Sequence, residues 1–126
     1  MAKLLVVDDE KVICEEFRDL MEEDGHQVDT AFNGPEAIRK VSEKEYDLIF
    51  LDVLLPRMEG RQIFEEMRKI RQVSVVFMSG YLPPNKEKEA LSLGALACLK
   101  KPLDLELVKQ LIQKAEEKAS GRGGTV

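Results

Sequence analysis

The chain has 126 residues, 44% of them hydrophobic and 34% charged, with a formal net charge of −5 at pH 7. This length and composition are typical of one soluble globular domain, and the acidic balance argues against general nucleic-acid affinity, because no basic excess is present to neutralise phosphates. No apolar stretch approaches the roughly 20 residues that cross a bilayer, and Cys14 and Cys98 form neither a metal-ligand spacing nor a disulfide framework. We therefore expect a cytoplasmic protein that makes no contact with a membrane.

Short apolar runs alternate along the chain with longer segments of helical period. In chain order they predict a strand over 3–7, a helix over 12–24, a strand over 27–31, a helix beginning at Asn33-Gly34-Pro35, a strand over 47–51, a helix over 59–70, a strand over 74–78, a helix over 86–93, a strand over 97–100 and a helix that Asp104 can cap. Gly25 and Gly94 suit the ends of the first and fourth helices.

The predicted strands are apolar almost throughout, so helices must cover both faces of the sheet that they form. This predicts an α/β fold with a doubly wound, five-stranded parallel sheet over residues 1–120. The glycine-rich residues 121–126 are expected to form a flexible tail.

Polar residues stand where four of these strands end. Asp8 and Asp9 follow the first strand, Asp52 the third, Ser79 the fourth and Lys101 the fifth. In an open parallel sheet the carboxyl ends of the strands meet at one edge, and ligands bind there. We expect these five side chains to form one acidic site.

The residue types at this edge indicate phosphoryl transfer. Adjacent carboxylates such as Asp8 and Asp9 repel each other unless a cation lies near them, and Mg²⁺ prefers oxygen ligands. With Mg²⁺ present, Asp52 becomes a candidate nucleophile for a phosphoryl group. The Ser79 hydroxyl is a candidate donor to a phosphoryl oxygen, and the Lys101 ammonium a candidate partner for Asp52 and then for the phosphoryl group.

Each motif alone also has a structural interpretation. One of the two adjacent aspartates can cap the helix that follows, and Asp52 and Ser79 can be turn residues. Lys100 competes with Lys101, although alternation along the strand points the two side chains in opposite directions. The four motifs in this order, each at a strand end, favour the phosphoryl-transfer interpretation.

The motifs "LLVVDDE", "LIFLDVLLPRMEG", "VVFMSG" and "CLKKP" resemble those of the receiver domains of bacterial response regulators, over about residues 3–119. The resemblance implies the strand order 2-1-3-4-5 of the flavodoxin-like fold. It also implies site roles: Asp52 as phosphoacceptor, Asp9, Asp52 and the Leu54 carbonyl as direct Mg²⁺ ligands, Asp8 acting mostly through water, and Ser79 and Lys101 binding the phosphoryl group.

One position departs from the family pattern. Three residues before the family lysine, where the family usually has a Tyr or Phe that turns inward on activation, this chain has Cys98. We interpret Cys98 as a small buried apolar residue. Leu54 and Tyr81 occupy variable family positions beside the site and should tune the phosphoryl lifetime, while His26 is expected in an exposed turn.

The family resemblance implies a signalling module that catalyses only its own phosphorylation and dephosphorylation. Its expected partners are a sensor histidine kinase, a downstream protein and, on phosphorylation, a second copy of the chain. The chain either acts alone through protein contacts or is a receiver cut from a longer protein. The alternatives are a haloacid-dehalogenase-like phosphatase, which would want an Asp-x-Asp motif in place of adjacent acids, and a flavodoxin-like electron carrier, which would want a Ser/Thr-rich phosphate loop.

Overall fold

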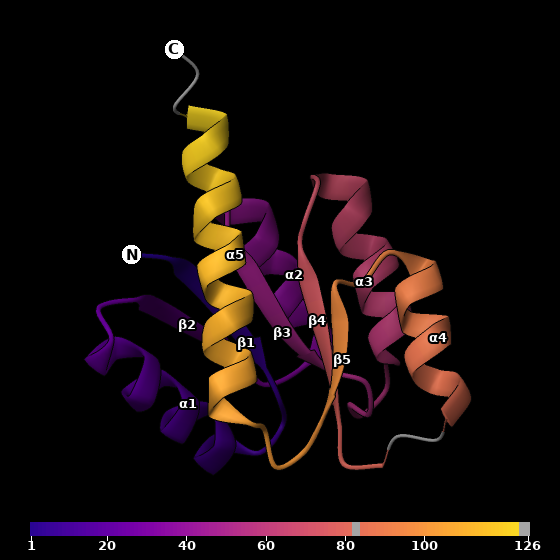
Figure 1. Ribbon diagram of the computed structural model, residues 1–126. Coiled ribbons are helices and arrows are strands. Elements are labelled where there is room, and N and C mark those ends of the chain that lie inside the picture. Colours follow the sequence, from indigo (N-terminus) through magenta and orange to yellow (C-terminus); the bar gives the residue numbers. More distant parts are fainter. Residues whose placement is uncertain (82–83, 124–126) are drawn as a thin grey trace.

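Five strands and five helices alternate along the chain in the computed structural model, which describes residues 1–81 and 84–123. In chain order they are β1 (Lys3–Val7), α1 (Lys11–Glu23), β2 (Gln27–Ala31), α2 (Gly34–Glu43), β3 (Leu48–Asp52), α3 (Gly60–Ile70), β4 (Val75–Ser79), α4 (Pro84–Leu93), β5 (Ala97–Lys100) and α5 (Leu105–Gly123). The strands form one parallel sheet in the order β2-β1-β3-β4-β5 (Figure 1). The predicted fold class and strand order are confirmed.

Alternate residues of each strand pack against opposite helix layers, as strand geometry requires. Leu5 and Ile49 belong to the cluster that α2, α3 and α4 cover, whereas Leu4 and Phe50 belong to the cluster that α1 and α5 cover. Because both faces are covered, β3 and β4 are buried along their whole length. This two-sided core fixes the carboxyl ends of β1, β3, β4 and β5 at one edge.

Two strands run one residue further than the sequence predicts. Asp52 and Ser79 are the last residues of β3 and β4, because the parallel ladder still pairs Asp52 with Met78 and Ser79 with Lys100. The carboxylate and the hydroxyl therefore start from regular strand backbone.

The helix ends mostly follow the local signals. The Asn33 side chain accepts a hydrogen bond from the backbone N–H of Glu36 at 2.8 Å, and Asp104 accepts from the N–H of Glu106 at 3.0 Å. Gly25 has a φ of 89°, a backbone conformation that glycine adopts without strain. Helix α5 continues through residues 121–123, so it extends into the segment assigned to the tail, and residues 124–126 lie outside the described residues.

Three side chains differ in exposure from what the sequence predicts. The helical period over 12–24 and 59–70 places Leu20 and Ile70 on the apolar faces of those helices, but these residues are 40% and 41% exposed. The buried stripe of α1 runs through Cys14 and Met21, which leaves Leu20 at its margin, and Ile70 is the last residue of α3. His26 is half-buried, because its Nδ1 accepts a hydrogen bond from the backbone N–H of Ala2 at 3.0 Å.

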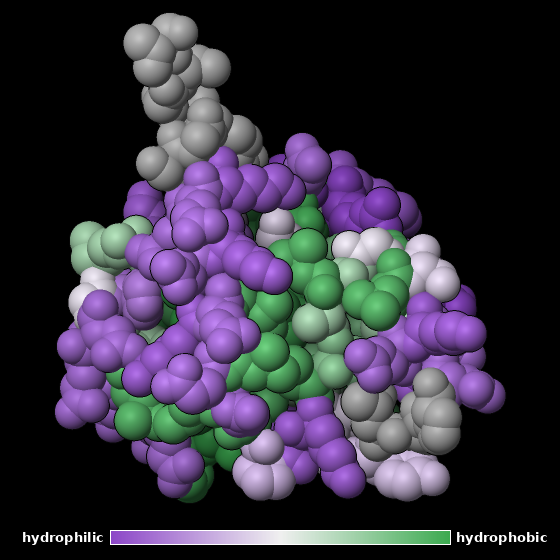
Figure 2. All heavy atoms as spheres, in the orientation of Figure 1, coloured by the Kyte–Doolittle hydropathy of each residue, from purple (hydrophilic) through white to green (hydrophobic). Residues whose placement is uncertain are grey.

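The exposed apolar side chains include several from α4, the turn before β5, and α5: Leu91, Leu96, Leu105 and Leu107. Figure 2 shows hydrophobic surface gathered between α5 and α4 on the face drawn. No helix among the described residues is long and apolar enough to cross a membrane.

Candidate functional site

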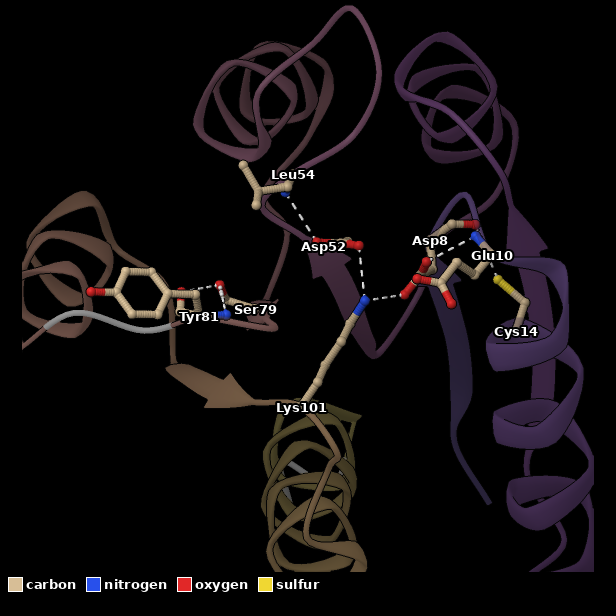
Figure 3. Close-up of polar contacts among 8 residues, drawn as sticks. All are labelled: Asp8, Glu10, Cys14, Asp52, Leu54, Ser79, Tyr81 and Lys101. Atoms are coloured by element: carbon tan, nitrogen blue, oxygen red, sulfur yellow. Dashed lines mark hydrogen bonds and ion pairs between the residues drawn. The ribbon is translucent and has the colours of Figure 1, made fainter.

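The carboxyl edge of the sheet brings the predicted site residues together. Asp8 follows β1 directly and is fully buried, while Asp52 and Ser79 end β3 and β4 with 6% and 2% of each residue exposed. Buried polar side chains need partners. Lys101, just beyond β5, supplies one for both carboxylates (Figure 3).

The Lys101 ammonium lies between two carboxylates from different strands. Its Nζ is 2.6 Å from Oδ2 of Asp8 and 2.9 Å from Oδ2 of Asp52. Burial lowers the pKa of Lys101, but the hydrogen bonds and charges of Asp8 and Asp52 outweigh burial and hold the pKa above its usual value. Lys100 is exposed, and Lys101 is the lysine that contacts these carboxylates.

Asp8 is fixed by its own turn. Its Oδ1 accepts a hydrogen bond from the backbone N–H of Glu10 at 2.9 Å, and the thiol of Cys14 donates to its carbonyl oxygen at 3.4 Å. Burial, aided by the charge of Asp8, raises the pKa of Cys14 to about 11, so the thiol stays protonated at neutral pH. Helix α1 begins after Glu10 with no side-chain cap, so the capping interpretation of the adjacent aspartates was wrong.

The three carboxylates suit a divalent cation. Each of Asp8, Asp9 and Asp52 offers one oxygen, and these atoms lie within 4.8 Å of one another. Three negative charges against the one positive charge of Lys101 leave a net charge of −2 in this cluster. Asp9 is exposed and open to a hydrated ion, and an all-oxygen donor set is the one Mg²⁺ prefers.

The loop after β3 shapes the approach to Asp52. Oδ1 of Asp52 accepts a hydrogen bond from the backbone N–H of Leu54 at 3.0 Å, and the Leu54 side chain is 71% exposed. Gly60 closes the loop, since its N–H donates to the Val53 carbonyl at 3.0 Å. A Cβ at Gly60 would lie 2.8 Å from the Val53 Cα, so any larger residue would displace the loop.

Ser79 is close to the carboxylates in the fold but turned toward its own loop. Its hydroxyl donates to the Tyr81 carbonyl at 2.5 Å and accepts from the Tyr81 N–H at 3.2 Å (Figure 3). The Tyr81 side chain is 75% exposed. Sequence reasoning placed Ser79 correctly but missed this pairing, which depends on the turn geometry beyond β4.

Residues 4–113 match the model of a family described as response regulator receiver domain. This chain belongs to that family. It is 38% identical over 112 residues to the transcriptional regulatory protein CpxR homolog of Haemophilus influenzae, across 88% of the chain and 49% of that protein. It is 31% identical over 113 residues to sporulation initiation phosphotransferase F of Bacillus subtilis, across 89% of the chain and 91% of that protein.

Solved receiver structures agree with the fold. The crystal structure of a two-component response regulator from Clostridium difficile superposes with a TM-score of 0.87 at 29% identity, covering 94% of this chain and 98% of that one. The receiver spans 49%, 54% and 26% of the first three curated relatives that it matches. It is thus a phosphorylatable receiver of two-component signalling. The phosphatase alternative finds no support.

The departure at Cys98 holds in this receiver. Cys98 is 7% exposed and belongs to the core cluster beneath α2, α3 and α4, which confirms its interpretation as a buried apolar residue. Burial, with a smaller effect of the Glu87 charge, raises the pKa of its thiol. The inward position that the family usually fills with an aromatic ring therefore holds a small neutral side chain.

Proposed function

We propose that Asp52 is the phosphoacceptor of this receiver, that a sensor histidine kinase supplies the phosphoryl group with Mg²⁺ present, and that phosphorylation changes the conformation to control a downstream protein. The observation that carries this proposal is the Lys101 ammonium, which bridges Asp8 and Asp52 at the carboxyl edge of the sheet. A cation held there can follow negative charge as it moves onto a phosphoryl group.

Exposure and contact with Lys101, taken together, favour Asp52 over its two neighbours. The Asp8 side chain contacts Lys101 but is fully buried. The Asp52 side chain retains 8% exposure at the mouth of the site. Asp9 is exposed but has no contact with Lys101 among the described residues. Asp52 therefore combines access with a bound cation.

The acidic cluster fits a magnesium ion. In our proposal Asp9, Asp52 and the Leu54 carbonyl would hold it directly, and Asp8 would act mostly through water. When bound, Mg²⁺ would neutralise charge on the phosphoryl oxygens. The net charge of −2 among Asp8, Asp9, Asp52 and Lys101 supports such an ion.

The transfer forms a bond between a carboxylate oxygen of Asp52 and the phosphorus. The phosphorus–nitrogen bond of the donor phosphohistidine breaks, and the electron pair leaves with the imidazole nitrogen. Lys101 exchanges its contact with the Asp52 oxygen for a phosphoryl oxygen, and the Ser79 hydroxyl leaves the Tyr81 carbonyl to donate to another. In the separate dephosphorylation step, the oxygen of a water molecule bonds to the phosphorus, the bond between the phosphorus and the Asp52 oxygen breaks, inorganic phosphate leaves with the protons of the water, and the Asp52 carboxylate is restored.

The output of the receiver is proposed to be a protein contact. The hydrophobic surface between α4 and α5 supports a downstream partner or a phosphorylation-dependent homodimer there (Figure 2). One relative is named as a transcriptional regulatory protein and another as a phosphotransferase, so both kinds of output occur among proteins similar to this receiver.

Intact-mass measurement tests the proposal. A small phosphodonor with Mg²⁺ should add one phosphoryl group to the wild-type chain, and chelation of the metal should suppress the adduct. Asp52→Asn should show no adduct, whereas the matched variant Asp47→Asn, which changes an acid at the opposite edge of the sheet, should keep it. A persisting adduct in Asp52→Asn would reject the assignment.

A further inference from the structure

Helix α4 is held unevenly along its length. Asn85 to Glu89, in its first half, are all exposed. Burial begins at Ala90, which is 3% exposed, and Leu93 packs against the same core cluster. The packing that holds α4 on the domain is therefore concentrated in its second half.

A groove separates α4 from its neighbour α3, and the two helices lie side by side in Figure 1. The groove has a volume of about 540 Å³ and is lined by Arg61, Asn85, Lys88, Glu89, Ser92 and Leu93. Five of these six residues belong to α4, and only one of the five, Leu93, is its last residue. The exposed part of α4 thus has solvent beside it, and this space allows the helix to tilt without displacing packed side chains.

Arg68 bridges α3 to the end of α4. Its Nη1 donates to the carbonyl oxygen of Leu93 at 2.5 Å, and this is the one α3–α4 hydrogen bond found among the described residues. The Leu93 carbonyl belongs to the last turn of α4, where carbonyls lack partners within the helix and attract cations. Gly94 leaves room for the Arg68 guanidinium, since a Cβ at this position would crowd the same nitrogen at 3.2 Å. Its φ of 108° also favours glycine.

The Arg68 guanidinium is itself held in place. It lies 5.0 Å from the ring centroid of Phe64, within the range of a cation–π contact. The Phe64 ring packs edge-on against Phe77 of β4, with 5.6 Å between centroids. The contact with Leu93 therefore starts from a side chain that is fixed on the buried core.

We propose that Arg68 is a positioning residue that fixes the C-terminal end of α4 to α3, so that phosphorylation tilts α4 about this end. The proposal rests on phosphorylation at Asp52. The hydroxyl of Ser79 must leave the Tyr81 carbonyl, and this turn precedes the N-terminal end of α4. Movement therefore enters α4 at its exposed end and meets a fixed point at Leu93.

A rigid helix that tilts about Leu93 moves in proportion to distance from that residue. At 1.5 Å per residue, Lys86 lies roughly 10 Å from Leu93 along the axis and Ala90 roughly 4.5 Å, so Ala90 should move about half as far as Lys86. Movement at Leu93 and Gly94 should be close to zero. This gradient separates a tilt from a displacement of the whole helix.

Amide signals of the full chain, recorded with and without beryllofluoride and Mg²⁺, test the proposal in wild type, Arg68→Gln and Arg61→Gln. Arg61 lies on the same helix, lines the same groove and pairs with Glu65, but among the described residues it makes no hydrogen bond to the Leu93 carbonyl. Wild type and Arg61→Gln should show changes that decline from Lys86 to Leu93. In Arg68→Gln the signals of Leu93 to Ala95 should respond more strongly than they do in wild type, which flattens the gradient.

Two results would overturn the proposal that α4 tilts about an end fixed by Arg68. Changes of equal size at both ends of α4 in wild type would show that its C-terminal end is not fixed, and an unaltered gradient in Arg68→Gln would show that Arg68 does not fix it. The signals of Val53 and Leu54 report binding beside Asp52 independently. If the signals of Val53 and Leu54 do not respond in wild type, the proposal of phosphorylation at Asp52 is rejected, and the proposed tilt is rejected with it. If these signals respond but α4 shows no gradient, only the proposed tilt is rejected.

Discussion

Replacement of Asp9 by asparagine should stabilise the metal-free protein. The oxygens of Asp8, Asp9 and Asp52 lie within 4.8 Å of one another. Because Asp9 is exposed, a water-like dielectric applies, and each repulsion at that distance costs roughly 0.9 kcal/mol. Two repulsions offset by one attraction to Lys101 leave a net cost of about 1 kcal/mol, which corresponds to a rise in Tm of about 4 °C for a chain of this size.

Thermal unfolding with a chelator present measures this effect. Glu15→Gln is the matched control, because it removes an exposed acid from α1 without touching the cluster. The rise in Tm of Asp9→Asn over wild type should be smaller at high salt, because salt screens the repulsion between the carboxylates. Mg²⁺ should raise the Tm of wild type by binding the folded state, and Asp9→Asn should respond much less. A lower Tm for metal-free Asp9→Asn than for wild type would refute the repulsion argument.

Cys98→Tyr should leave phosphorylation of Asp52 intact, because Cys98 is buried in the core cluster beneath α2, α3 and α4. It should instead change the amide response of α4 to beryllofluoride. Loss of the phosphoryl adduct in Cys98→Ala would contradict this reasoning. Tyr46→Phe should lower the free energy of unfolding by about 1–2 kcal/mol at pH 7, measured by urea unfolding, because it removes a 2.6 Å hydrogen bond to the charged Asp29. Tyr81→Phe is the control and should lower it little, because Tyr81 is exposed. Burial raises the pKa of Asp29, but the hydrogen bonds that it accepts, led by the one from Tyr46, lower the pKa on balance. The stabilisation from the Tyr46–Asp29 hydrogen bond is therefore fully present above the pKa of an unfolded Asp, about 3.9, and is lost as pH falls through the lower pKa of the folded state. The difference between Tyr46→Phe and wild type should therefore narrow by pH 3 (about one pH unit below that unfolded value), and a constant difference would reject this assignment.

The sequence predicts the fold and the site membership because both follow from one regularity. Apolar strands covered on both faces form a parallel sheet, and polar residues at the strand ends must then meet at one edge. Asp52, Ser79 and Lys101 were found in this way, alternation along the strand predicted that Lys100 and Lys101 point in opposite directions, and the family resemblance pointed to Lys101.

Pairings across that edge were not predictable from strand ends alone. The hydrogen bond between Lys101 and Asp8 depends on how far a long side chain reaches past the ends of β4 and β3. The turn of the Ser79 hydroxyl toward Tyr81 depends on local loop geometry. Arg68 belongs to a mixed-charge helix, where the sequence indicates a solvated face. Its contact with Leu93 arises only from the packing of α3 beside α4.

The location of the phosphoryl group tests the account most directly. The phosphorylated chain would be reduced with borohydride, which converts an acyl phosphate to an alcohol, digested, and mapped by tandem mass spectrometry. We predict that the conversion occurs at Asp52 alone and requires Mg²⁺ during phosphorylation. Conversion at Asp8 or Asp9 would contradict the assignment of Asp52 as the phosphoacceptor between Lys101 and the acidic cluster.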